Sequence, residues 1–131
     1  MIIIGLTGTI GAGKSTVMRW LAERGACIVD ADGLTREVQQ PGEAAFTQIV
    51  DAFGKGILKA NGEIDRAALG AIVFANPDEL RRLEAIVHPA VYGRFTQRVA
   101  ECDAPVLVVE AIKLLESGRL VPYCDEIWVV A

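Results

Sequence analysis

The pattern of apolar and polar residues changes twice within the first thirty positions of the chain. Residues 2–7 form a continuous apolar run interrupted only by glycine and threonine, which predicts a strand buried on both faces, as in a parallel sheet. Apolar residues then recur at helical spacing up to Gly25, so a helix is predicted over residues 14–24. A second apolar run over residues 26–29 predicts another strand. The order of strand, glycine-rich turn, helix and strand is typical of an α/β protein.

The middle of the chain has helical periodicity. Helices are predicted over residues 34–39 and 43–53, the second with its apolar residues on one face and a closing glycine at Gly54. Residues 57–64 contain an Asn-Gly turn signal and predict either a small hairpin or an irregular excursion.

A strong helix start follows at Asn76, where a capping side chain precedes a proline and two acids. The helix is expected to end near residue 87, because Pro89 lacks the amide hydrogen that helix continuation requires. A separate helix is predicted over residues 90–101, and apolar runs predict core strands over residues 106–110 and 126–131.

Length and composition favour one domain spanning residues 1–131, with a helical region at about 34–101. The chain has 131 residues, 52% of them hydrophobic, and no linker-like tract divides it. The formal net charge of −4 disfavours a nucleic-acid binder that uses a basic face. No apolar run approaches the roughly 20 residues that cross a bilayer, and the first residues do not resemble a secretion signal, so no membrane partner and a cytoplasmic location are expected.

The spacing of the cysteines and the histidine does not match a known disulfide pattern or metal-binding motif. Cys27, Cys102 and Cys124 are odd in number and widely spaced, so they are expected to be small apolar residues kept reduced. His88 has no neighbouring histidine or cysteine pair with which to build a zinc site.

The most informative segment is residues 8–15, GTIGAGKS, which matches the phosphate-binding pattern G-x-x-x-x-G-K-[ST]. Its glycines let backbone N–H groups wrap phosphate oxygens, and the following helix adds its positive end. Lys14 is expected to bridge the outer phosphates of a nucleotide, and the Ser15 hydroxyl to hold Mg²⁺. The alternative is an ordinary glycine-rich turn, which the placement between a predicted strand and helix disfavours.

Carboxylates follow two of the predicted strands. Asp30 and Asp32 come after the second strand, at the sheet edge where α/β proteins bind ligands. Asp32 is a candidate to accept the proton of an acceptor hydroxyl, whereas Asp30 could simply cap the next helix. Glu110 ends an apolar run and could lie near a metal ion, although any core strand can end in this way.

In these motifs, and in further matches along essentially its whole length, the sequence resembles dephospho-CoA kinases. The matching segments, in order, are GLTG at residues 5–8, GAGKST at 11–16, DAD at 30–32, QPG at 40–42, FG at 53–54, DRAAL at 65–69, IVFANP at 72–77 and HP at 88–89. The resemblance implies a P-loop NTPase-like parallel sheet flanked by helices, with a helical substrate-side insertion. It also implies Mg²⁺-dependent phosphorylation of the ribose 3′-hydroxyl of dephospho-CoA by ATP, the last step of coenzyme A biosynthesis.

The resemblance assigns roles to individual positions. It implies that Asp32 is the catalytic base, that Lys14 is catalytic, and that Thr7 and Arg36 lie beside the acceptor. Arg36 could equally be a surface arginine, and His88 could be a structural hydrogen-bonding residue. The residues expected to bind the phosphates of ATP are Gly8, Gly11, Ala12, Gly13, Lys14, Ser15 and Thr16.

The sequence departs from the family pattern in two places. Ile112 and Lys113 stand where the family has proline and leucine, while Glu116 remains and is expected to contact the acceptor. Lys113 could instead meet an acceptor phosphate. The family also has an arginine-bearing lid beyond the point where this sequence ends, so activity of these residues alone is an open expectation.

Two alternatives remain at this point. The first is another small-molecule kinase of the shikimate or nucleoside monophosphate type, because these also combine a P-loop with acids after the second strand. The second is a nucleotide-binding fragment that transfers no phosphoryl group.

Overall fold

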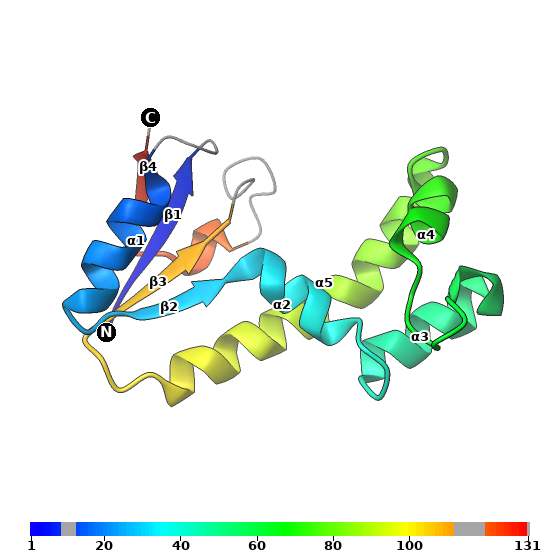
Figure 1. Ribbon diagram of the computed structural model, residues 1–131, viewed down its shortest axis with the longest axis horizontal. Helices are drawn as coiled ribbons and strands as arrows, with labels where there is room; N and C mark the ends of the chain where they lie inside the picture. The colour runs from blue at the N-terminus through cyan, green and yellow to red at the C-terminus, as the bar shows by residue number, and fades with distance from the viewer. Residues whose placement is uncertain (9–12, 112–119, 131) are drawn as a thin grey trace. The chain divides into compact units, whose positions relative to one another are not determined.

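The structure is a computed structural model that describes residues 1–8, 13–111 and 120–130. The chain forms two compact units (Figure 1). Unit 1 comprises Met1–Leu34 and Phe95–Ala131, and unit 2 comprises Thr35–Arg94. Within the described ranges, no helix has both the length and the apolar character needed to cross a bilayer.

Unit 1 is built on the parallel sheet that the apolar runs predict. Its strands are β1 (Ile2–Gly8), β2 (Cys27–Asp30), β3 (Val106–Glu110) and β4 (Glu126–Val130), in the order β2-β3-β1-β4. All three neighbouring pairs are parallel. The carboxyl ends of the four strands therefore share one edge, and the predicted α/β fold with a parallel sheet is confirmed. A short 3₁₀ turn, η2 (Val121–Tyr123), precedes β4.

Helix α1 (Lys14–Glu23) covers one face of this sheet. Leu21 of the helix packs with Ile4, Leu6 and Val108 in one buried cluster. Successive side chains of a strand point to opposite faces, so the neighbours of Val108 in β3 face away from α1, and both are fully buried. This burial on both faces explains why β3 has no polar residue before Glu110.

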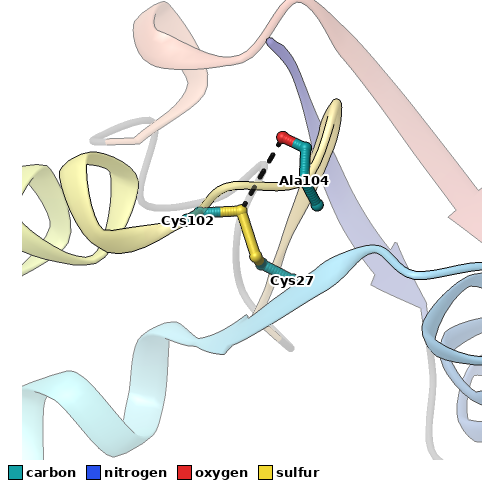
Figure 2. Close-up of a disulfide and its surroundings, with 3 residues drawn as sticks. All are labelled: Cys27, Cys102 and Ala104. Atoms are coloured by element: carbon teal, nitrogen blue, oxygen red, sulfur yellow. Dashed lines mark hydrogen bonds between the residues drawn. A yellow bond between two sulfur atoms is a disulfide. The ribbon is translucent and has the colours of Figure 1, made fainter.

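A disulfide joins Cys27 to Cys102, so the expectation that all cysteines are reduced is wrong for two of the three (Figure 2). Cys27 begins β2, and Cys102 lies just after the last helix, with Cα atoms 6.2 Å apart although 75 residues separate them in sequence. Their spacing gave no sign of the pair, because only the alignment of β2 beside β3 brings the two segments together. The Cys102 Sγ also lies 4.0 Å from the Ala104 carbonyl oxygen. Cys124 is free, and burial raises the pKa of its thiol.

Unit 2 is helical. It contains the second half of α2 (Ala31–Val38), then α3 (Ala44–Phe53), the 3₁₀ turn η1 (Lys55–Ile57), α4 (Arg66–Val73) and the first two thirds of α5 (Pro77–Glu101). Its buried residues form one apolar core: Val38, Ala45, Ile49, Ile57, Ile64, Leu69, Val73 and Val87.

Two features of unit 2 bear on the sequence predictions. An isolated antiparallel bridge pairs Leu58 with Ile64, which selects the small hairpin over the irregular excursion. Helix α4 did not emerge from the apolar pattern, and it begins at a cap formed by Asp65, whose carboxylate accepts the N–H groups of Ala67 and Ala68.

Helix α5 is continuous through Pro89, so the predicted break near residue 87 is wrong. Pro89 and Ala85, whose carbonyl would otherwise bond to residue 89, are both exposed. Water can therefore solvate that carbonyl, and the helix can bend toward its covered side without losing a buried hydrogen bond. The two separately predicted helices are one helix.

Arg94 of α5 forms ion pairs with two carboxylates near the start of unit 2. Its guanidinium lies 3.2 Å from the Glu37 carboxylate of α2 and 2.8 Å from that of Glu43, the residue that precedes α3. The hydrogen bond to Glu43 is the main cause that raises the pKa of Arg94. This pair of contacts fixes the turn between α2 and α3.

Candidate functional site

The glycine segment begins and ends at positions that only glycine fits well. Gly8 ends β1, and a Cβ there would lie 2.6 Å from the Val130 carbonyl oxygen of β4. Gly13 has a φ of +87°, a left-handed conformation that other residues rarely adopt, and a Cβ there would meet no described atom within 4 Å. Gly11 and Ala12 of the predicted loop lie outside the described residues.

The N-terminus of α1 has no negative charge of its own. Gly13 caps it without a side-chain hydrogen bond, and no acidic residue lies in its first turn. By contrast, α2, α4 and α5 each have an acidic side chain at their start. Ser15 and Thr16 in the first turn of α1 are exposed. The N–H groups at the start of α1 and its positive end therefore favour an anion here.

Lys14 and Glu110 form an ion pair at the edge of the sheet. The Lys14 Nζ lies 2.5 Å from the Glu110 Oε1, and the two side chains are only 11% and 14% exposed. Glu110 ends β3, whose neighbour β1 leads into the glycine segment. Sequence analysis left the role of Glu110 open, and the acid at the end of an apolar run was the signal that pointed to it.

The two aspartates after β2 have different surroundings. Asp30 stands opposite Glu110 in the strand register, and its Oδ1 accepts the backbone N–H of Asp32 at 3.1 Å. This bond caps α2, as one interpretation of the sequence proposed. Asp32 itself is exposed in the first turn of α2. No described residue donates a hydrogen bond to its carboxylate, so that oxygen pair is open to a ligand hydroxyl.

The remaining predicted residues are distributed as follows. Thr7, at the end of β1, is 5% exposed. Arg36 is exposed on α2, one helical turn after Asp32. Glu116 and Lys113 lie outside the described residues. The structure thus brings Lys14, Glu110 and the end of β1 to one edge of unit 1.

The residues at this edge fit Mg²⁺ better than a softer metal. Ser15 and Glu110 offer hard oxygen donors beside the phosphate-binding helix end. In the described ranges, no group of three His, Cys, Asp or Glu side chains forms a metal cage. Such sparse protein ligation suits an ion that is bound mostly by phosphate oxygens and water.

The comparisons with known proteins agree with this geometry. The family model described as dephospho-CoA kinase matches residues 2–131. Dephospho-CoA kinases of Geobacter metallireducens and Geobacter sulfurreducens are 53% and 50% identical to 99% of this chain, which covers 66% and 67% of those proteins. The chain therefore spans about two thirds of the length of these relatives.

Solved structures give the same result. The Thermus thermophilus protein TT1252 is similar over 99% of this chain and 65% of its own, with a TM-score of 0.84 and 33% identity. A dephospho-CoA kinase from Campylobacter jejuni is similar over 97% of this chain and 64% of its own, with a TM-score of 0.73 and 25% identity. Sequence, fold and site together establish that this chain belongs to the dephospho-CoA kinase family.

Proposed function

We propose that this chain is the core of a kinase that transfers the γ-phosphoryl group of ATP to the ribose 3′-hydroxyl of dephospho-CoA, giving ADP and coenzyme A. The observation that carries the proposal is the largely buried Lys14, held at a helix N-terminus that has no acidic cap. Membership of the family supplies the acceptor.

On the nucleotide side, the chain offers backbone N–H groups and a lysine to the phosphates. The backbone N–H groups of Gly13, Lys14 and Ser15 and the predicted loop residues Gly8, Gly11 and Ala12 would surround the phosphates. Lys14 would exchange its contact with Glu110 for the outer phosphates, where it neutralises charge that develops during transfer. Mg²⁺ held by Ser15, when bound, would supply further neutralisation of the phosphate oxygens.

On the acceptor side, Asp32 is the proposed base. The 3′-hydroxyl oxygen attacks the γ-phosphorus, the bond from that phosphorus to the bridging oxygen breaks, and ADP leaves with the bond electrons. The hydroxyl proton passes to the Asp32 carboxylate, whose exposure leaves it accessible to the ribose. Thr7, Arg36 and Glu116 are proposed to position the acceptor.

A second candidate function is nucleotide binding without transfer. The observations that favour it are Lys14 and the start of α1 without an acidic cap, because these features account for nucleotide binding by themselves. Phosphoryl transfer depends in addition on the positioning of the acceptor, so a site can bind ATP and still transfer slowly.

The proposal is tested by comparing Asp32→Asn with Asp30→Asn. Asparagine caps helices as well as aspartate does, so Asp30→Asn keeps the start of α2 while removing a charge two residues from the proposed base. We expect Asp32→Asn to lower transfer to dephospho-CoA by about 10²–10⁴-fold, with ATP binding retained, because general base catalysis contributes about this much. Asp30→Asn should keep most of the activity.

Four outcomes would count against the proposal. Undiminished transfer in Asp32→Asn would remove the base, and equal loss in both variants would indicate a general effect of charge. Binding of ATP without any coenzyme A formed by excess protein would favour the second candidate. Phosphorylation of shikimate or a nucleoside monophosphate instead would change the acceptor.

The cytoplasmic location expected from the sequence stays a prediction. Because the cytoplasm keeps most thiols reduced, the oxidation state of Cys27 and Cys102 in growing cells is an informative measurement.

A further inference from the structure

The Cys27–Cys102 disulfide lies at the end of the sheet that leads to the proposed base (Figure 2). Strand β2, which begins at Cys27, is the end strand of the sheet and pairs with β3 alone among the described strands. Cys102 follows the last residue of α5 and precedes β3. The bond therefore joins the start of β2 to the segment that enters its neighbouring strand, 75 residues further along the chain.

Both cysteines can be reached from solvent. Each is only partly buried, and the residues that follow them, Ile28 and Asp103, are exposed. Thiol–disulfide exchange requires that a thiolate reach one of the two sulfur atoms. A disulfide enclosed in an apolar core would be closed to this attack, whereas the present bond is open to a small dithiol in the folded protein.

The disulfide holds the segment that leads to the proposed base. Strand β2 has only four residues, and Asp30 at its end caps α2 by accepting the N–H of Asp32 at 3.1 Å. An end strand as short as this is held by backbone hydrogen bonds along one side, so it is among the parts of a sheet that open most easily. The disulfide fixes the first residue of β2 and thereby limits this opening.

The phosphate-binding side of unit 1 has support of its own. Strand β1, which leads into the glycine segment, lies between β3 and β4 and pairs with both. Helix α1 packs on this part of the sheet through Leu21. Breaking the disulfide should therefore loosen β2 and leave the Lys14 end of the site in place. The reduced protein should stay folded, because Val29 of β2 is buried.

We propose that Cys27 and Cys102 form a site of reversible thiol–disulfide exchange, and that its redox state controls the acceptor side of the active site. The role of Asp32 in this inference rests on the proposed function. In the oxidised protein the bond holds β2, and with it the aspartate that caps α2 beside the base. In the reduced protein β2 loosens, while the nucleotide side is unchanged.

The reagent class is a dithiol, and the reaction is a two-step exchange. A thiolate of the dithiol attacks one cysteine sulfur, the S–S bond breaks, and its electron pair passes to the other sulfur, which takes up a proton. The second thiol of the reagent then attacks the mixed disulfide and releases the remaining cysteine as a thiol. The products are two cysteine thiols and the oxidised, cyclic reagent. A disulfide oxidant such as oxidised glutathione reverses the change.

The first test is the relaxation of backbone amides measured by nuclear magnetic resonance, which does not depend on catalysis. Oxidised protein is compared with protein treated with dithiothreitol, at a temperature where circular dichroism shows both to be folded. Reduction should lower the order parameters of β2 from about 0.85 to about 0.6 or less, and those of β1 and α1 should stay near the rigid value. Cys27→Ser should behave as the reduced wild type in both conditions. Cys124→Ser is the matched control and should respond as the wild type does, because that thiol is free.

The second test measures transfer to dephospho-CoA in the same proteins. Reduction should lower kcat/KM for dephospho-CoA about tenfold or more, because a displacement of about 1 Å in a reacting group is enough for such a loss. The affinity for ATP, measured by titration calorimetry, should be unchanged. Oxidised glutathione should restore transfer in the wild type and have no effect on Cys27→Ser.

The two tests separate this inference from the proposed function. Loosening of β2 alone, with no transfer in either redox state, would support the exchange site and reject the proposed function. Equal order parameters in the two states would overturn the inference, and so would equal loosening of β1 and α1, which would indicate a general effect of the bond. Equal kcat/KM in the two states, or a disulfide that dithiothreitol reduces only after denaturation, would also overturn it.

Discussion

At the scale of single residues, the Lys14–Glu110 ion pair affects how strongly a nucleotide phosphate can bind. Both side chains are largely buried, and each charge is the other's partner. A phosphate that binds Lys14 must therefore replace the Glu110 carboxylate, which costs part of the binding energy. In return, the lysine is held at the helix end before the ligand arrives. The Glu110 carboxylate thus competes with a phosphate for Lys14 and also holds the Lys14 side chain in position.

Glu110→Gln should separate these two effects. Without nucleotide, the variant should lose about 1–3 kcal/mol of unfolding free energy, because a mostly buried ammonium is left without a carboxylate. ATP added with a metal chelator should then raise its melting temperature more than that of the wild type. Glu126→Gln, at the exposed start of β4, is the control and should behave as the wild type. Equal shifts with ATP in Glu110→Gln and the wild type would contradict the competition.

The sequence predicts residues whose role depends on neighbours in the chain. The glycine pattern located Gly8 and Gly13, and the position of Asp30 before a helix suggested its cap. It did not predict that Glu110 contacts Lys14, because that contact depends on the pairing of β1 with β3.

At the scale of elements, α5 shows how solvent exposure changes the effect of a proline. From the sequence, Pro89 predicts a helix break because proline cannot donate the backbone hydrogen bond to the residue four positions before it. This prediction takes no account of whether the proline lies on the buried or the exposed face of the helix. In the structure that residue faces water, while apolar residues before and after it pack in the core of unit 2. Packing on both sides therefore holds the helix together. The sequence pattern did not predict helix α4 for a different reason. The helix is only eight residues long, so its apolar residues repeat over too few turns to give a clear helical period.

Pro89→Ala should stabilise the protein. An alanine restores the amide that can bond to the Ala85 carbonyl and removes the clash of the ring, so we expect a gain of about 1–3 kcal/mol in urea unfolding. Gly93→Ala lies on the same helix, where a Cβ would meet no described atom within 4 Å, and should gain about 1 kcal/mol from helix propensity alone. A loss of stability in Pro89→Ala would contradict this prediction and show that the proline ring stabilises the native helix.

At the scale of the whole molecule, the chain leaves unit 1 within α2 and returns to it within α5. The parallel sheet and the helical region were predictable because strands and helices each have a characteristic pattern of apolar residues. The disulfide was not, because it depends on where the returning chain meets β2. Cys27 precedes the departure into unit 2, and Cys102 follows the return.

Reduction of this disulfide should lower stability strongly. Closing a loop of 75 residues removes chain entropy from the unfolded state worth about 4 kcal/mol. A reductant should therefore lower the melting temperature by about 10 °C or more, and the Cys27→Ser variant should melt at that lower temperature with or without reductant. Cys124→Ser should keep the full response, because that thiol is free. Identical melting of the wild type in both conditions would contradict the prediction.

The same bond makes the backbone a covalent ring with two tails. All of Thr35–Arg94 lies inside the ring, since residues 27 and 102 flank it. A protease that cuts once anywhere in this unit, for example at the exposed Ala60-Asn61 turn, opens the ring without releasing a fragment. The nicked protein would keep its mass on a non-reducing gel and separate into two pieces only after reduction. A kinase core cut within its helical unit would therefore remain one molecule.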